Sequence, residues 1–162
     1  MQEPVNRGGL IILTTFVVAC ILAIIPLPDN LVIYRPEWVS LVLIFWCMIV
    51  PHRVGVFSGW CTGLFMDVLY GTLLGQYALT MSVLAFLTYK LQTRLRLYPL
   101  LQQSMIIMLL IALQQMMGLW IKGISGEVPN NISYWLPSVT STLIWPVVAI
   151  LLHKIRQIFG IV

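Results

Sequence analysis

The sequence predicts an all-α integral membrane protein in which residues 1–162 form a single domain of six transmembrane helices. Three observations support this: 60% of the residues are hydrophobic, 9% are charged, and the apolar residues fall into six runs joined by short connections. A soluble domain carries about 25% charged residues and tolerates only small exposed apolar patches. The composition therefore excludes an ordinary water-soluble protein.

The six runs approach the roughly 20 apolar residues that a helix needs to cross the hydrocarbon core of a bilayer. The predicted spans lie near residues 8–26, 37–50, 54–71, 76–90, 99–121 and 136–153. The second and fourth are short, so we expect them either to extend into flanking apolar residues or to thin the bilayer locally. An uncleaved first span is favoured over a signal peptide or lipoprotein leader, because the apolar run continues past Cys20.

The distribution of Lys and Arg predicts that both chain ends lie in the cytoplasm. With that orientation, only Arg35 and Lys122 fall outside. The inside connections hold seven cations: Arg7, Arg53, Lys90, Arg94, Arg96, Lys154 and Arg156. The last five of these form a predicted basic surface, in segments that we expect to lie along anionic lipid headgroups. Membrane lipids are a better partner for this surface than nucleic acid.

The third span contains small residues at every fourth position. In GVFSGWCTGLFMDVLYG the repeating positions are Gly55, Gly59, Gly63, Asp67 and Gly71, and Gly75 follows at the same spacing. Small residues at this spacing let helix backbones approach closely in lipid. Packing within the bundle is favoured over a face for another protein, because this pattern is common in membrane helices.

Asp67 is the carboxylate placed deepest in a predicted span, so it should face the protein interior and be paired or protonated. Gln114 and Gln115 in the fifth span lie at a similar predicted depth, and Lys122 could reach the same level from the outer end. These three are the predicted partners of Asp67. An interhelical polar contact is favoured, while contact with a partner protein and a transport role stay open.

Several other residues mark turns and helix ends. Arg35, Pro36 and Trp38 begin the second span, and Pro51 with Arg53 forms the inner turn before the third. Pro146, after Trp145, should kink the sixth span because proline removes a backbone donor. Three tryptophans are predicted to lie deep at helix contacts: Trp46, Trp60 and Trp145.

No catalytic or cofactor-binding set is recognisable. The sequence has no GxSxG, HExxH or Walker motif, and the cysteines lie inside apolar runs without a CxxC pair. The acids expected on the outer side of the membrane, Asp29, Glu37 and Glu127, belong to short loops. We therefore expect neither an enzyme nor a bound cofactor or metal.

Four motifs give the chain a resemblance to a known family over nearly its whole length. They are PDNLVIYRPEW at 28–38, PHRVGV at 51–56, GLFMDVLYGTLLG at 63–75 and LIWPVVAILLHKIRQ at 143–157. With these motifs the chain resembles the MreD family of rod shape-determining membrane proteins, in its gammaproteobacterial form. The resemblance implies a multi-pass protein of the bacterial inner membrane without catalytic activity.

The resemblance also implies partners. MreD-like proteins act in the cell-elongation complex with the bitopic protein MreC as the direct partner, and with MreB, RodA and a class B penicillin-binding transpeptidase. The expected role is that of a scaffold that supports peptidoglycan synthesis and rod shape. The family is also similar in fold to the S-components of energy-coupling-factor transporters, so small-molecule binding or transport is the alternative. That alternative predicts an outward-facing polar cavity, for which Asp67, Gln76, Thr80, Gln114 and Gln115 are candidates.

Overall fold

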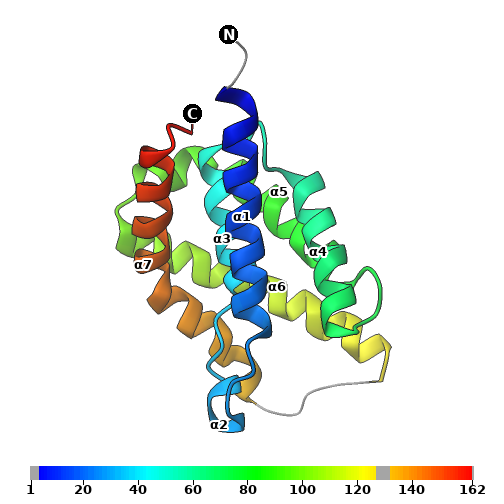
Figure 1. Ribbon diagram of the computed structural model, residues 1–162. Helices are drawn as coiled ribbons and strands as arrows, with labels where there is room; N and C mark the ends of the chain where they lie inside the picture. The colour runs from blue at the N-terminus through cyan, green and yellow to red at the C-terminus, as the bar shows by residue number, and fades with distance from the viewer. Residues whose placement is uncertain (1–3, 127–131, 162) are drawn as a thin grey trace.

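The computed structural model describes residues 4–126 and 132–161, with side chains from residue 8 to 126 and from 133 to 161. Glu127 and the side chain of Arg7 lie outside these ranges. The described chain is helical (Figure 1). Its elements are α1 (Pro4–Ile24), α2 (Asp29–Val32), α3 (Trp38–Ile49), α4 (Val56–Tyr70), α5 (Gln76–Leu97), α6 (Leu100–Ile124), the 3₁₀ helix η1 (Ile132–Trp135) and α7 (Leu136–Ile158). The predicted all-α class is confirmed.

Each predicted span overlaps one of the main helices α1, α3, α4, α5, α6 and α7. Two helical segments, residues 100–124 and 133–158, are long and apolar enough to cross a membrane by length and composition. Shorter apolar helices cover residues 8–24, 38–49 and 56–70. The arrangement therefore combines long and short apolar helices.

Two helices run past the predicted ends of their spans, because they continue through basic segments. The fourth span was expected to end at Lys90, but α5 runs to Leu97, so the segment expected along the headgroups is the end of a helix. No proline or glycine interrupts it before Pro99, which restricts the preceding residue and ends the helix. In the same way α7 continues to Ile158. The short second span did not extend: α3 has 12 residues, about 18 Å of helix.

The core is built around α3, whose residues from Val39 to Met48 are all buried. This helix packs on α1, α5 and α7. Trp46 and Trp145 are fully buried, as predicted. Trp60 was predicted to be deep but is 46% exposed and stacks on Phe57, because the opposite side of α4 faces the bundle.

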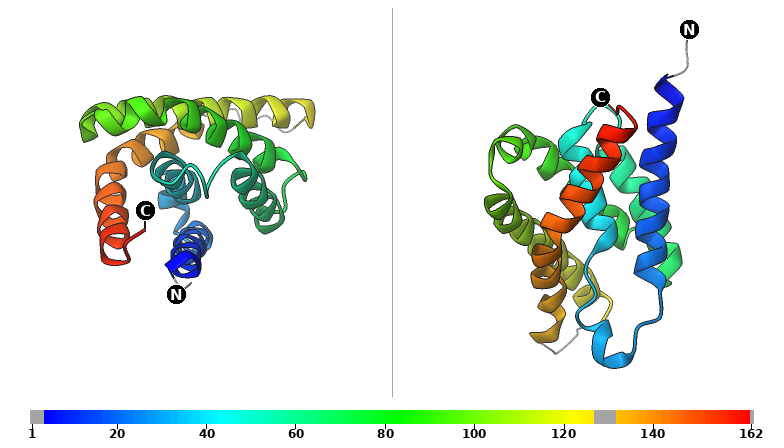
Figure 2. Two further views of the ribbon diagram at one scale, coloured as in Figure 1. Left: turned by 90° about the horizontal axis from the view of Figure 1, so that it is seen from above. Right: turned by 60° about the vertical axis from the view of Figure 1, so that its left-hand side comes forward.

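Two groups of helices differ in direction. Seen from above, α5 and α6 run across one side of the molecule, while α1, α3 and α4 are viewed nearly along their axes (Figure 2). The same view shows α7 bending about halfway along, and Pro146 lies inside this helix. The two chain ends lie at the same end of the bundle in Figure 1, opposite α2. We call these the terminal end and the α2 end.

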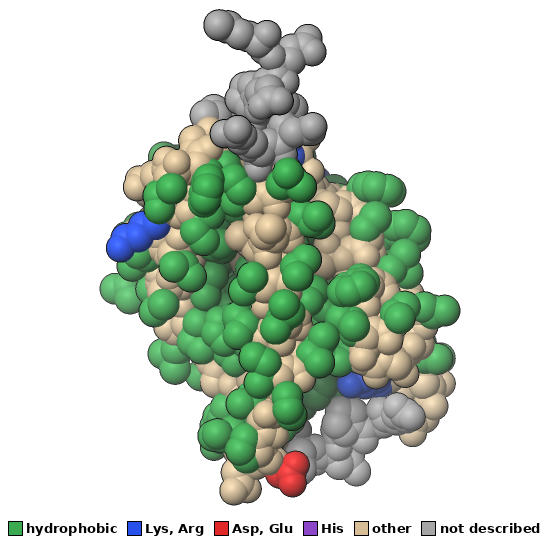
Figure 3. Space-filling view, in the orientation of Figure 1, with side chains coloured by type: hydrophobic (Ala, Val, Ile, Leu, Met, Phe, Trp, Pro, Cys, Tyr) green, Lys and Arg blue, Asp and Glu red, His purple; other side chains and the backbone are tan. Residues whose placement is uncertain are grey.

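The surface is too apolar for a protein that is surrounded by water. Hydrophobic side chains cover most of the face shown in Figure 3, and charged side chains are sparse on it. Residues such as Leu13, Val68 and Leu109 are 59–69% exposed. A surface of this kind requires cover by lipid or by another protein.

Candidate interaction site

The closest helix contact joins α4 and α5 through two glycines. A Cβ atom added to Gly59 would lie 2.8 Å from the carbonyl oxygen of Met81. At Gly63 it would lie 2.6 Å from the backbone nitrogen of Ala78, and also against the carbonyl oxygen of Tyr77. These contacts are to backbone atoms, which cannot turn aside as a flexible side chain can. The structure therefore uses the two glycines for packing within the chain.

The remaining members of the glycine repeat have other roles. Gly55 lies at the N-terminal end of α4, where its N–H donates to the Ser58 hydroxyl at 2.7 Å. Gly71 ends α4 with φ +62°, and Gly75 precedes α5 with φ +103°. Glycine adopts this left-handed conformation without the steric cost that a Cβ brings. The repeat thus divides into two packing glycines and the glycines of the helix ends.

Asp67 joins the same two helices through its carboxylate, which is almost completely buried. Its Oδ1 accepts hydrogen bonds from the Thr72 hydroxyl at 3.0 Å and the Tyr77 N–H at 2.7 Å. Its Oδ2 accepts from the N–H groups of Gly75 at 2.9 Å and Ala78 at 3.2 Å. The first N–H groups of a helix lack partners within that helix. Asp67 therefore caps α5 from the end of α4.

This geometry corrects the predicted partners of Asp67. Gln114, Gln115 and Lys122 were expected, but the four hydrogen bonds of the carboxylate go to residues 72–78. Asp67 lies near the C-terminal end of α4, only 8 to 11 residues before the uncapped N–H groups of α5. The short segment after α4 therefore places backbone N–H donors against the Asp67 carboxylate, which then needs no side chain from a distant helix. Of the predicted partners, Gln114 makes a 4.0 Å contact from its Nε2 to the Met81 sulfur.

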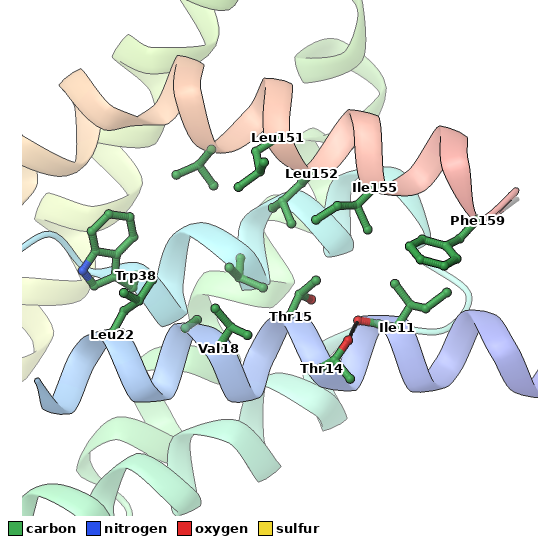
Figure 4. A pocket seen from close by; sticks show the side chains of 13 residues that line it. Ile11, Thr14, Thr15, Val18, Leu22, Trp38, Leu151, Leu152, Ile155 and Phe159 are labelled. Atoms are coloured by element: carbon green, nitrogen blue, oxygen red, sulfur yellow. Dashed lines mark hydrogen bonds between the residues drawn. The ribbon is translucent and has the colours of Figure 1, made fainter.

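A groove separates α1 from α7, and α3 forms its floor (Figure 4). Its volume is about 300 Å³. It is lined by Ile11, Thr14, Thr15, Val18, Ala19 and Leu22 of α1, Trp38 and Val42 of α3, and Val148, Leu151, Leu152, Ile155 and Phe159 of α7. Figure 4 shows Ile11 and Phe159 at one end and Leu22 with Trp38 at the other. From Ile11 to Leu22 the groove follows α1 for about 17 Å, or three helical turns.

The lining of the groove is almost entirely apolar. The hydroxyls that face it already have partners: Thr14 donates to the Ile11 carbonyl at 2.8 Å, and Thr15 donates to the Ile12 carbonyl at 2.7 Å. The Thr15 oxygen also accepts from Trp46 Nε1 at 2.9 Å, which ties α1 to α3. Apart from the Trp38 indole N–H, which makes no hydrogen bond to a described residue, the groove presents apolar side chains, so its natural occupant is apolar.

Two of the predicted arginines cap helix ends. The guanidinium of Arg35 donates to the carbonyls of Ala23 and Ile25 at the end of α1. Arg96 donates to the carbonyls of Met48 at 2.7 Å and Ile49 at 2.9 Å at the end of α3. The last carbonyls of a helix lack internal partners and attract cations. Sequence reasoning placed both arginines at the membrane surface but gave neither this role.

The other predicted turn residues lie at the expected connections, whereas the other basic residues lie on α5 and α7. Pro51 and Arg53 lie in the turn between α3 and α4, Pro36 precedes α3, and Trp38 is the first residue of α3. Trp145 donates to Gln103 Oε1 at 3.3 Å. The side chains of Lys90, Arg94 and Lys154 are exposed, and Arg156 Nε donates to the Ile161 carbonyl at 3.1 Å.

The helical fold and the apolar exterior are those of a membrane protein. The family model described as rod shape-determining protein MreD matches residues 6–155. The rod shape-determining protein MreD of Haemophilus influenzae (strain ATCC 51907 / DSM 11121 / KW20 / Rd) is 30% identical over 149 residues, which cover 90% of each chain. No solved structure matches the chain.

The chain belongs to the MreD family, as its four sequence motifs predicted. Membership supports a role in rod shape determination and assigns the chain to a family of membrane proteins. It also implies involvement in the rod-shape complex. The similarity to transporter S-components stays a prediction.

Proposed function

We propose that this protein is a non-catalytic scaffold of the bacterial cell-elongation complex, and that the groove between α1 and α7 holds the transmembrane helix of MreC. In this proposal the six main helices cross the inner membrane, both chain ends face the cytoplasm, and MreB, RodA and the class B transpeptidase join the same complex. The role supports peptidoglycan synthesis through assembly. The observation that carries the proposal is a groove of about 300 Å³ that runs along two helices and is lined almost entirely by apolar side chains.

The shape of the groove favours a helix as occupant. Its walls are two main helices, and its length corresponds to three turns of a helix lying beside them. Lipid chains are as apolar as the groove, so burial alone gives a partner helix no advantage over lipid. The advantage must come from fitted side-chain contacts, and Val18, Leu22 and Leu151 provide fixed branched shapes for them.

The tight side of the molecule is less suited to a partner. The small residues of α4 that permit close approach are already packed on α5. An additional helix there would meet exposed larger side chains such as Phe65 and Val68. The groove is therefore the better docking site within the described chain.

Photo-crosslinking in cells tests the proposal. A photoreactive amino acid placed at Val18 or Leu151 should crosslink MreC. Matched controls are the preceding residues, Val17 and Ile150, which have similar exposure but do not line the groove. We expect the groove positions to give at least fivefold more MreC adduct than their neighbours.

Equal adduct yields at Val17 and Val18 would contradict the groove as the site. Adducts that concentrate on α4, for example at Val68, would move the docking site to the other side of the molecule. If no position gives an adduct with MreC while rod shape still depends on this chain, direct scaffolding of MreC is wrong.

A further inference from the structure

Two cavities meet at the α2 end of the bundle, away from the groove. One has a volume of about 290 Å³ and the other about 220 Å³. Val32, Glu37 and Pro137 line both. Unlike the groove, these cavities contain polar groups, which the proposed scaffold role leaves unused.

The larger cavity collects acceptors and donors from several elements. Glu37 is the residue before α3. The α6 helix contributes Gln115 and Lys122, and η1 contributes Ser133 and Tyr134. Tyr77 of α5 completes the polar lining. Residues this far apart in sequence are brought together only by the fold.

The side chain of Gln115 is the feature of this cavity that indicates a ligand. Its side chain is only 7% exposed, and its Oε1 has no hydrogen-bond partner among the described residues. The Oε1 atom itself has almost no accessible surface, and the Nε2 group donates to no described residue, so the NH₂ group is the part of this side chain that can bind a molecule in the cavity.

The surrounding groups hold this part of the cavity in place. Tyr134 donates its hydroxyl to the Gln115 backbone carbonyl at 3.1 Å, and its oxygen approaches within 3.2 Å of where a Cβ on Gly118 would be. Burial, with a contribution from the charge of Glu37, raises the pKa of Tyr134 to about 12, so the hydroxyl keeps its proton. The Lys122 ammonium lies 5.6 Å from the centre of the Tyr134 ring.

Glu37 supplies an acidic acceptor, just before the first residue of α3. Its backbone N–H donates to Ser141 Oγ at 2.9 Å, which fixes it against α7. Burial raises the pKa of its carboxyl, while a hydrogen bond from Ser40 and the charges of Lys122 and Arg35 lower it. Burial is the largest of these effects, so the pKa of Glu37 is raised overall, and a ligand cation would favour the ionised carboxylate against it.

We propose that the Glu37–Gln115–Lys122 cavity binds a small zwitterion that carries a primary ammonium beside an anionic oxygen. The ammonium donates to Glu37, and the anionic oxygen faces Lys122 and accepts from the Gln115 NH₂ group. This is the chemistry of an ethanolamine phosphate headgroup, and a free molecule can supply it as well. The cavity volume suits a headgroup and not a whole lipid, and the exposed apolar residues Val32 and Ile33 lie at its edge.

Native mass spectrometry of the purified full-length protein in detergent tests the proposal. The probes are phosphatidylethanolamine, phosphatidylglycerol, phosphatidylcholine and soluble phosphoethanolamine. Phosphatidylglycerol lacks the ammonium, and the quaternary ammonium of phosphatidylcholine has no N–H donor. Because hydrogen bonds to charged groups are strong, we expect phosphatidylethanolamine to bind about tenfold more tightly than either.

The variants separate this cavity from general packing. Glu37→Gln, Gln115→Leu and Lys122→Met should each weaken phosphatidylethanolamine binding about tenfold. Gln114→Leu is the matched control, because Gln114 is equally buried and also has an unpartnered Oε1 but does not line the cavity. Asp29→Asn controls for removal of an acid at the same end of the bundle.

The outcomes also identify the source of the zwitterion. Preference for phosphatidylethanolamine without binding of phosphoethanolamine assigns the site to lipid, and binding of both assigns it to the shared headgroup chemistry. The proposal is overturned if phosphatidylethanolamine and phosphatidylglycerol bind equally, or if Gln114→Leu weakens binding as much as Gln115→Leu. Should Glu37→Gln fail to fold, the Gln115 and Lys122 variants decide. Crosslinking to MreC is unaffected by any of these results.

Discussion

The α4–α5 contact and the α1–α7 groove represent opposite solutions to helix packing in lipid. At α4–α5, Gly59 and Gly63 bring two backbones together, and the Asp67 carboxylate caps the second helix. Between α1 and α7, branched side chains such as Val18 and Leu151 face open space above α3. One contact is closed within the chain, whereas the other leaves an open groove.

The difference teaches where a membrane scaffold can place its partner surface. A strong small-residue motif attracts attention in the sequence, but here the chain uses it for its own fold. The groove has no comparable motif, because Thr, Val, Leu and Ile are ordinary residues of a membrane helix. Substitutions can break each half of this comparison separately.

Gly63→Ala should have the largest effect on stability. The new Cβ would overlap the backbone of Ala78, so α4 and α5 must separate, at a cost of about 3 kcal/mol or more. Thermal unfolding in detergent measures the loss. Gly9→Ala is the control, since no atom lies within 4 Å of its added Cβ, and its stability should stay equal or rise. An unchanged midpoint for Gly63→Ala would show that α4 and α5 are not this close.

Asp67→Asn should destabilise by about 2 to 3 kcal/mol. Each carboxylate oxygen accepts two hydrogen bonds, so in either orientation the new amide NH₂ faces two donors. Asp29→Asn, at an exposed position, should change stability by less than about 0.5 kcal/mol. Thermal unfolding of both variants gives the comparison, and equal midpoints would mean that the cap contributes nothing.

Val18→Trp should leave the fold intact and weaken MreC binding. The indole fills the groove, and we expect about tenfold less MreC to copurify, which corresponds to about 1.4 kcal/mol. Val17→Trp adds the same side chain about 100° away around α1, where it does not line the groove, and should copurify MreC normally. Cell shape gives a second measurement, with rounded cells expected for the first variant only. The groove is excluded as the docking site if the two variants behave alike.

Arg96→Gln should have the smallest effect, a loss of about 1 kcal/mol of stability, because two hydrogen bonds to the end of α3 disappear from an exposed guanidinium. Arg94→Gln removes an exposed cation two residues earlier and should change stability by less than about 0.5 kcal/mol. Chemical unfolding resolves this difference better than a thermal scan. A similar loss for both variants would indicate a general charge effect in place of a cap.

Much of the helix pattern could be predicted from the sequence, because long apolar runs and the prolines and charges between them act locally. The ends of α5 and α7 could not, since basic residues such as Arg94 and Arg156 are compatible with both a helix and a surface loop. The buried state of Asp67 was predictable from its place in an apolar run. Its partners were not, because backbone N–H groups carry no sequence signal.

The sequence by itself determined that this protein is helical, that lipid surrounds it, and that it belongs to the MreD family. These conclusions follow from the composition, the spacing of the apolar residues and the sequence motifs, which are properties of short stretches of chain. Only the tertiary structure decided which face of each helix stays open and which polar residues share a cavity. Val17 and Val18 are neighbouring residues of the same type, and so are Gln114 and Gln115. The sequence alone therefore does not distinguish the two members of either pair. Their different surroundings arise from the directions in which α1 and α6 present them to distant helices.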